Sequence, residues 1–355
     1  MWFHFSLPGH SGPPATIWSP PPANEAPNTP TAKQLQDQLG RTLTASIQPT
    51  TAAAYQHHWQ AFLDFIWQHL KANPPFPAQL NHICLFLVHL SNSKISHSTI
   101  RTYLSAISFV HKLHNTTDPT AAFIISKTLQ GIKNTTQPQT DQRLPITKDI
   151  LDKLLHALPY ATSTHSDHIL WHAIFLLAYH ACLRAGELTL SKNPANVISF
   201  SQVSTTTDTI QIQFLHYKHS RGHTPMLSVR AQPLISFCPV HALQQYLSIR
   251  GSQPGQLFVN PDKSPVTISQ FSTILRSTAI LSSIPPMRFT THSFRIGKAT
   301  QMAKDGHPDQ LIRRAGRWKS SAYNHYLRPD NVTLPLWTPS ASWTRCLPPV
   351  CTPLG

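Results

Sequence analysis

The chain has 355 residues, which is long for a single hydrophobic core and suits two domains with tails. It carries 29 Lys and Arg residues against 14 Asp and Glu residues, a formal net charge of +15 at pH 7, which predicts a polyanion as the partner. The 5 cysteines are scattered without a CxxC pair and the 22 histidines are spread along the chain, which argues against a zinc module. We expect an intracellular protein with no metal site and no cofactor.

The N-terminal residues 1–32 are rich in proline and lack the charged and apolar regions of a secretory signal. They predict a disordered leader. The most apolar run, residues 169–183, is too short to span a bilayer and contains His172 and His180. This run predicts a buried helix and no membrane segment.

Residues 33–134 predict an all-helical domain. Apolar residues recur at helical spacing in four segments, which are residues 51–70, 77–91, 97–114 and 119–133. Basic residues outnumber acidic ones in this domain, a pattern that suits contact with phosphates. We select Arg101, Lys127 and Lys133 as DNA-binding candidates, although a solvated charged face explains any single lysine as well.

The polar, turn-rich residues 135–145 predict a linker, and a second domain is expected over residues 146–330. Its first helix follows a Thr147 cap. Residues 208–230 alternate apolar and polar side chains around a polar turn, which predicts a β-hairpin with Lys218 near the turn.

Five short sequences in a fixed order carry a resemblance: "ACLRAGEL", "CPVHALQQYLSIRG", "GQLFVN", "HSFRIGKAT" and "AGRWKSSAYNHYLRP". Over residues 48–330 the chain resembles tyrosine recombinases of the phage-integrase superfamily. Within this superfamily it most resembles the integrases of DIRS-type retroelements and related eukaryotic mobile elements. The resemblance implies a mainly α fold. It has an all-helical core-binding domain of the SAM-like type and a mixed α+β catalytic domain with a small antiparallel sheet.

The resemblance assigns roles that the chemistry of a phosphodiester explains. Metal-free cleavage requires cations on the nonbridging oxygens, and by the match Arg184 and Arg295 supply two planar guanidiniums. His292 lies three residues before Arg295, on the same helical face, and assists proton transfer. Lys218 is expected to protonate the leaving 5′ oxygen. Arg221 is a weaker alternative for that role and a further DNA-binding candidate.

Trp318 stands where many relatives carry a histidine, and its indole can donate one hydrogen bond to the phosphate while packing the nucleophile's segment. Two tyrosines follow it. Tyr326 is eight residues past Trp318 in a string that resembles the family's nucleophile motif, and Tyr323 is five residues past it. We therefore expect Tyr326 to be the nucleophile.

The resemblance implies a site-specific recombinase that integrates a mobile element. It would bind double-stranded DNA, act through a 3′-phosphotyrosyl link and assemble as a homotetramer on two duplexes, in the nucleus if the host is eukaryotic. Two alternatives stay open, which are a type IB topoisomerase-like enzyme and a catalytically silent, domesticated DNA-binding protein. The Pro-rich tail, residues 331–355, is expected to dock on a neighbouring protomer or to fold back on its own domain.

Overall fold

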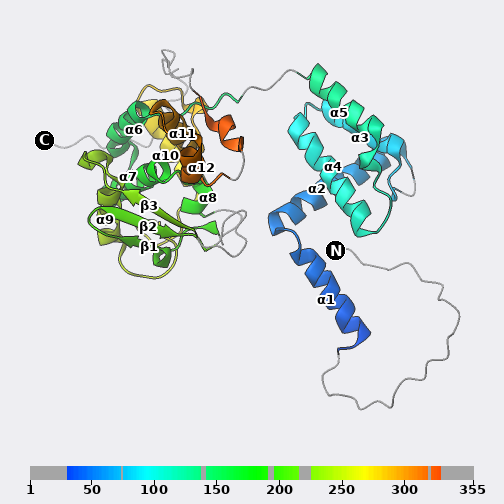
Figure 1. Ribbon diagram of the computed structural model, residues 1–355, viewed down its shortest axis with the longest axis horizontal. Coiled ribbons are helices and arrows are strands. Elements are labelled where there is room, and N and C mark those ends of the chain that lie inside the picture. The colour runs from blue at the N-terminus through cyan, green and yellow to red at the C-terminus, as the bar shows by residue number, and fades with distance from the viewer. Residues whose placement is uncertain are drawn as a thin grey trace. The chain divides into compact units, whose positions relative to one another are not determined.

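The structure is a computed structural model that describes residues 30–72, 75–136, 141–190, 196–215, 225–318 and 321–328. The chain divides into two compact units, Met1–Gln139 and Thr140–Gly355, so the division falls within the stretch expected to be a linker (Figure 1). The expected disordered leader, residues 1–32, lies outside the described residues except for Pro30, Thr31 and Ala32, and the expected docking tail, residues 331–355, lies wholly outside them.

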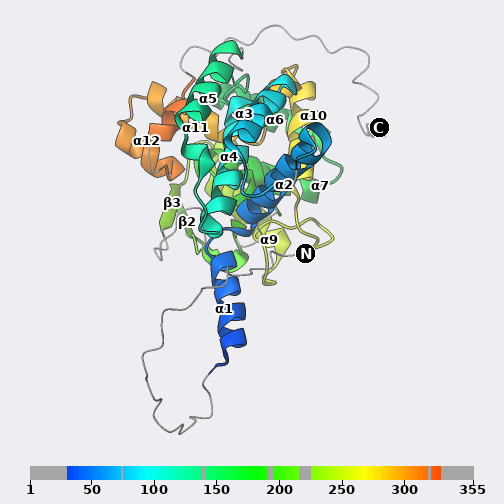
Figure 2. The ribbon, with the colours of Figure 1, turned by 90° about the vertical axis from the view of Figure 1, so that its right-hand side faces the viewer.

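The first unit is all helical among its described residues. Its elements are α1 (Ala32–Ala45), α2 (Pro49–Phe65), a π-helical turn η1 (Ile66–Leu70), α3 (Leu80–Asn92), α4 (His97–Leu113), a 3-10 turn η2 (Pro119–Ala121) and α5 (Phe123–Thr135). Helices α3, α4 and α5 lie side by side, and α2 packs on α4 (Figures 1 and 2). Their core holds the fully buried side chains of Phe62, Phe86, Leu87 and Ile100.

The first unit differs from the prediction in two places, of which the first is α1, because it was not among the four predicted segments. The sequence pattern predicted a single helix over residues 119–133, but the structure has the short turn η2 followed by a separate α5. The break lies at Ala122, whose extended backbone, with φ of −63° and ψ of 143°, ends η2 and precedes α5. Asp118 caps the start of η2, because its carboxylate accepts hydrogen bonds from the backbone N–H of Thr120 at 3.0 Å and from the Thr120 hydroxyl at 2.7 Å.

The second unit combines helices with one small sheet. Its larger elements are α6 (Lys148–Ala161), α7 (His165–His180), α8 (Ala185–Leu188), β1 (Val203–Thr205), β2 (Thr209–Gln213), β3 (Met226–Arg230), α9 (Pro239–Arg250), α10 (Ile268–Leu281), α11 (Ser293–Lys304), α12 (Asp309–Gly316) and the 3-10 helix η7 (Ser321–Tyr326). Short 3-10 turns lie at η4 (Phe200–Gln202), η5 (Ile235–Phe237) and η6 (Pro286–Arg288). Helix α6 begins after Thr147, as predicted, and the Thr147 hydroxyl accepts from the N–H of Ile150 at 3.4 Å.

The sheet has the order β1-β2-β3 with antiparallel pairing throughout. In the β2–β3 pair Ile210 faces Val229 and Ile212 faces Leu227, so the predicted hairpin is present. Helix α7 contacts α6, α9 and α11 and is buried almost all round, which explains why its sequence is apolar without a polar face. The predicted mainly α fold with a small antiparallel sheet is confirmed.

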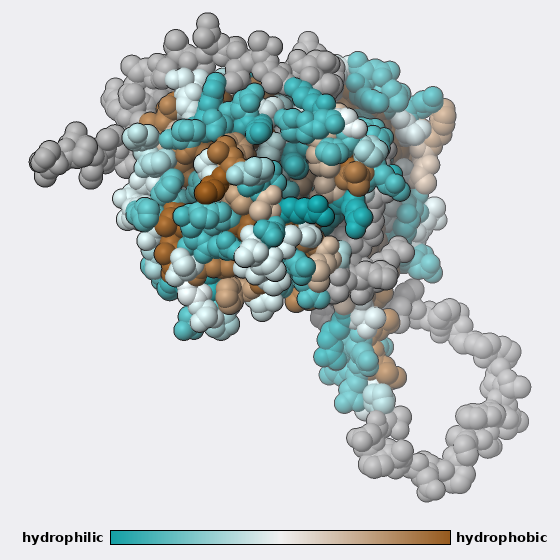
Figure 3. All heavy atoms as spheres, turned by 60° about the vertical axis from the view of Figure 1, so that its left-hand side comes forward, coloured by the Kyte–Doolittle hydropathy of each residue, from teal (hydrophilic) through white to brown (hydrophobic). Residues whose placement is uncertain are grey.

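The surface is mixed in character. Polar side chains cover most of the face seen in Figure 3, with exposed apolar side chains scattered among them. No helix in the described part of the chain is long and apolar enough to cross a membrane.

Gly297 lets α11 lie directly against the segment that precedes α6. A Cβ atom built at Gly297 would lie 1.7 Å from the carbonyl oxygen of Ile146, which belongs to the backbone and cannot rotate away. Ile146 is also held there, because its N–H donates to the carbonyl of Ser293 at 3.0 Å. The small residue therefore sets the position of the helix that carries His292 and Arg295.

We expect Gly297→Ala to lower the free energy of unfolding by about 3 kcal/mol, the usual scale for overpacking a tightly packed interior. Urea unfolding of the full chain measures this change. Gly131→Ala in α5 is the matched control, because no atom lies within 4 Å of its added Cβ, and this substitution should be neutral or slightly stabilising. Equal stabilities for the two variants would show that α11 and Ile146 do not meet as described.

Candidate active site

Arg295 is the buried centre of a cluster in the second unit. It lies on the first turn of α11 and its side chain is 0% exposed. Its Nη1 donates to the carbonyl oxygen of Cys182, and its Nη2 donates to the carbonyl oxygen of Gly316 at 2.9 Å. These bonds tie the start of α11 to the segment after α7 and to the end of α12.

Arg184 lies two residues after Cys182, at the N-terminal cap of α8, and is partly exposed. Its Nη1 donates to Oε1 of Glu187 at 2.9 Å, and its backbone N–H donates to Oε2 at 2.8 Å. Glu187 is buried, and its Oε2 also accepts from Nη2 of Arg317 at 2.6 Å. One carboxylate therefore holds two guanidiniums, and its role is to position them.

Two aromatic side chains cover Arg295. The guanidinium lies 4.8 Å from the ring centroid of Trp318 and 5.8 Å from that of Tyr326, within cation–π range. Gly316 makes room for the indole, because a Cβ there would lie 1.9 Å from a ring atom of Trp318. The "GRW" sequence thus brings the tryptophan close to the backbone that also binds Arg295.

The two candidate tyrosines have different surroundings. Tyr326 is half-buried, and its ring centroid lies 4.9 Å from that of His292 and 4.9 Å from that of Trp318. Tyr323 is 4% exposed and packs with Ala299 and Ile312 in a small core that fixes η7 to α11 and α12. A hydrogen bond to Asp309 raises the pKa of the Tyr323 phenol, which makes its phenolate harder to form. Of the two, Tyr326 lies among the groups expected to react.

His292 is half-buried at the N-terminal cap of α11. Burial first, and then the positive charges of Arg143 and Arg295, lower the pKa of His292 to about 4. The imidazole is therefore neutral at pH 7 and has a lone pair that can accept a proton.

This lowered pKa predicts a pH-dependent share of stability. Unfolding returns His292 to an ordinary pKa near 6.5, so between pH 6.5 and 4 the unfolded chain binds more protons and the fold loses stability as the pH falls. When the pH falls from 7 to 4, we expect the unfolding free energy of the wild type to decrease more than that of His292→Gln. Urea unfolding at both pH values measures it, and an unchanged difference would contradict a neutral, buried imidazole.

Sequence reasoning missed three charged residues, which are Asp141, Arg143 and Arg328, near the segment that contains Tyr326. Asp141 accepts from Nε and Nη2 of Arg143, each at 2.8 Å, and from Nη2 of Arg328 at 2.9 Å. Hydrogen bonding to Arg143 lowers the pKa of Asp141 to about 2, so the carboxylate stays charged. The backbone N–H of Arg328 donates to the Thr300 hydroxyl, which in turn donates to the carbonyl of Tyr326. Residues of the predicted linker therefore hold the chain on which Tyr326 lies.

Arg317 is a fourth residue that the sequence did not single out. The one signal for it is its place between Gly316 and Trp318 in the motif, which does not by itself distinguish it from the other arginines of α12.

Two expected residues cannot be placed. Lys218 and Arg221 fall in residues 216–224, between β2 and β3, which lie outside the described residues. Their assignment as general acid and DNA-binding residue stays a prediction. No group of three or more His, Cys, Asp or Glu side chains in the described ranges could hold a metal ion.

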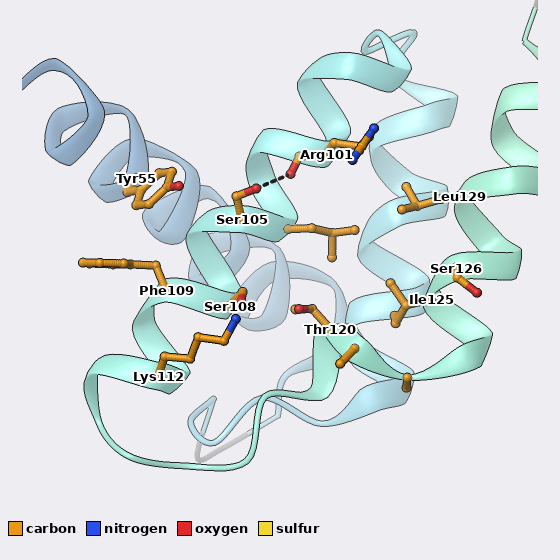
Figure 4. Close-up of a pocket in the computed structure, with 13 residues that line it drawn as sticks. Tyr55, Arg101, Ser105, Ser108, Phe109, Lys112, Thr120, Ile125, Ser126 and Leu129 are labelled. Carbon is orange, nitrogen blue, oxygen red and sulfur yellow. Dashed lines mark hydrogen bonds between the residues drawn. The ribbon is translucent and has the colours of Figure 1, made fainter. Parts of the chain in front are cut away.

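The other DNA-binding candidates are exposed in the first unit. Arg101 lies on α4, and Lys127 and Lys133 lie on α5, with the Lys127 ammonium 5.1 Å from the Phe123 ring centroid. Arg101 and Lys112 line a hollow of about 450 Å³ between α4, η2 and α5 (Figure 4). Its apolar floor includes Leu104, Ile125 and Leu129.

Comparison with known proteins identifies the second unit. Residues 145–331, more than half of the chain, match the Phage integrase family. The chain belongs to the phage integrase family. The predicted membership in the tyrosine recombinase superfamily is therefore confirmed, and it supports an enzyme of the site-specific recombinase class. A search of curated proteins finds no significant match.

Solved structures share the fold of this phage integrase family member. The Tn1549 transposon integrase in complex with transposon right end DNA is 15% identical with a TM-score of 0.57, over 84% of this chain and 93% of that chain. A lambda integrase dimer bound to a COC′ core site is 14% identical with a TM-score of 0.55, over 87% and 80%. The XerH site-specific recombinase bound to difH substrate is 14% identical with a TM-score of 0.56, over 86% and 83%.

Proposed function

We propose that this protein cleaves and rejoins DNA strands through a 3′-phosphotyrosyl intermediate and thereby integrates the DNA of a mobile element. The observation that carries the proposal is the position of Tyr326. Its ring centroid lies 4.9 Å from those of His292 and Trp318 and 5.8 Å from the buried Arg295 guanidinium. The expected nucleophile, a neutral imidazole and a fixed cation are therefore neighbours, which supports the proposal.

In the cleavage step the Tyr326 phenol oxygen attacks phosphorus, and the bond from phosphorus to the 5′ oxygen breaks. The phenol proton passes to neutral His292, whose lowered pKa leaves it free to accept. The 5′ oxygen leaves with a proton, for which Lys218 is the proposed donor. Arg184, Arg295 and Trp318 neutralise the charge that develops on the nonbridging oxygens.

In the joining step the 5′ hydroxyl of a second strand gives its proton to Lys218 and attacks the phosphotyrosyl phosphorus, while the bond from phosphorus to the Tyr326 oxygen breaks and His292 returns the proton to the phenol. One phosphodiester is exchanged for another, so the link stores the energy and neither ATP nor a cofactor is needed.

The proposed partner is double-stranded DNA. The net charge of +15 and the exposed Arg101, Lys127 and Lys133 support this partner, as do the DNA complexes in which the structural neighbours were solved. Exchange between two duplexes involves four strands, so a homotetramer is proposed. In this assignment residues 33–134 are the core-binding domain, residues 146–330 are the catalytic domain and the tail links protomers.

The transposon integrase among the structural neighbours supports a role in a mobile element. We further propose that this element is similar to DIRS-type retroelements. In a eukaryotic host the protein would then act in the nucleus.

Covalent trapping tests this function without knowledge of the target sequence. The protein is incubated with a library of random-sequence duplexes nicked in one strand, so that the short cleaved fragment diffuses away and the adduct cannot reverse. We expect a protein–DNA adduct that survives denaturing electrophoresis, with equal yield in EDTA. Sequencing of the trapped DNA then identifies the preferred site.

Two other outcomes of this experiment would each support one of the alternative functions. Noncovalent binding without an adduct would leave a silent DNA-binding protein. An adduct with plasmid relaxation, but no joining of two duplexes, would indicate a topoisomerase-like enzyme.

A further inference from the structure

Arg317 is a buried cation with unused hydrogen-bond donors. It ends α12 in a left-handed conformation with φ of 54°, and its side chain is 8% exposed. Nη2 donates to Glu187, but Nε and Nη1 are buried and have no hydrogen-bond partner among the described residues. Its guanidinium carbon lies 4.2 Å from the ring centroid of Phe214, which holds the group from one side.

The unused donors form a group with those of the expected site. Arg295 Nε and Trp318 Nε1 are also buried without a partner among the described residues. Arg295 bonds to Gly316, the residue before Arg317, and lies over Trp318, the residue after it. Leaving a buried donor unpaired is costly, so a concentration of such donors indicates a missing acceptor.

The charges indicate that the acceptor is an anion. The guanidiniums of Arg184 and Arg317 share the carboxylate of Glu187, and Arg295 bonds only backbone carbonyls, so positive charge is in excess. Burial lowers the pKa of Arg317, the Glu187 carboxylate opposes this shift, and the positive charges of Arg295 and Arg184 add to it. An anion with oxygens spread in several directions would relieve this repulsion.

A buried arginine with a purely structural role in this chain looks different. Arg250 is 4% exposed and lies 4.4 Å from the Phe200 ring centroid, in the same way that Arg317 lies on Phe214. The Arg250 guanidinium, however, donates to the carbonyl oxygens of Leu257, Gly251, Gln253 and Gln256. Each guanidinium nitrogen of Arg250 therefore has a partner, whereas Nε and Nη1 of Arg317 have none among the described residues.

We propose that Arg317 is a third arginine of the phosphate site, which positions Arg184 through Glu187 and adds positive charge that acts on the nonbridging oxygens of the scissile phosphodiester. This role rests on the proposed function. It adds a third guanidinium to the expected pair of Arg184 and Arg295. This guanidinium binds the same Glu187 carboxylate as Arg184.

A neutral substrate separates this role from a structural one. The duplex selected by covalent trapping is made in two forms, one with the natural scissile phosphate and one with a methylphosphonate, which lacks one negative charge. Adduct formation is timed for wild type, Arg317→Gln, Arg317→Lys and the control Arg250→Gln. Thermal unfolding of each full-length variant shows which of them are folded.

We expect Arg317→Gln to slow adduct formation about 100-fold on the phosphodiester, the scale of losing one preorganised donor, and much less on the methylphosphonate. Arg317→Lys should recover part of the loss, and Arg250→Gln should change both substrates equally. An equal loss for Arg317→Gln on both substrates, or no loss, would overturn the role while leaving the wild-type adduct and the proposed function intact. A wild type without any adduct would overturn the proposed function, and the role of Arg317 with it.

Discussion

Tyr326→Phe is expected to abolish covalent attachment to DNA while leaving noncovalent binding nearly unchanged. The substitution removes one hydroxyl and keeps the ring that packs with His292 and Trp318, so the site should retain its shape. Without the hydroxyl no oxygen remains to attack phosphorus. Denaturing electrophoresis measures the adduct, and a gel shift on the same duplex measures binding.

Tyr323→Phe is the matched control, because it removes the same group three residues earlier. Tyr323 is buried in the core of α11, α12 and η7, so its loss should affect stability more than cleavage. An adduct that disappears with Tyr323→Phe and persists with Tyr326→Phe would reverse the assignment of the nucleophile.

Arg295→Lys is expected to slow cleavage about 100- to 1,000-fold, although the charge is kept. A lysine cannot donate to Cys182 and Gly316 at once in the planar geometry of a guanidinium, and its ammonium cannot stack on Trp318 in the same way. An unpaired buried carbonyl should also cost about 1–3 kcal/mol of unfolding free energy. Single-turnover adduct formation and urea unfolding measure the two effects.

Arg276→Lys on α10 is the control for this substitution, because Arg276 is exposed. It should change neither cleavage nor stability. Cleavage by Arg295→Lys at the wild-type rate would show that the buried guanidinium does not act on the phosphate.

The sequence predicted those parts of the molecule that depend on neighbouring residues. Apolar spacing located α6, and Thr147 marked its start. Alternation located the β2–β3 pair, in which Ile210 and Ile212 are buried. His292 and Arg295 could be grouped because one helical turn separates them, and their common turn of α11 follows directly from that spacing.

Contacts between distant residues could not be predicted in this way. Arg317 meets Glu187 across 130 residues of sequence, and Arg328 meets Asp141 across 187. Neither pair lies in a periodic pattern, and an exposed arginine of α12 has the same local sequence properties as the buried one. The burial of Arg317 and the contact between Asp141 and Arg328 depend on how the helices pack together.

Mapping the DNA-bearing residue tests the central claim most directly. The trapped wild-type adduct is digested with nuclease and trypsin, and residues 320–345 form one tryptic peptide that holds both Tyr323 and Tyr326. Fragmentation of this peptide in a mass spectrometer locates the remaining nucleotide. We predict a 3′-phosphate linked to Tyr326, and a nucleotide on Tyr323 or on a residue outside this peptide would contradict the proposed site.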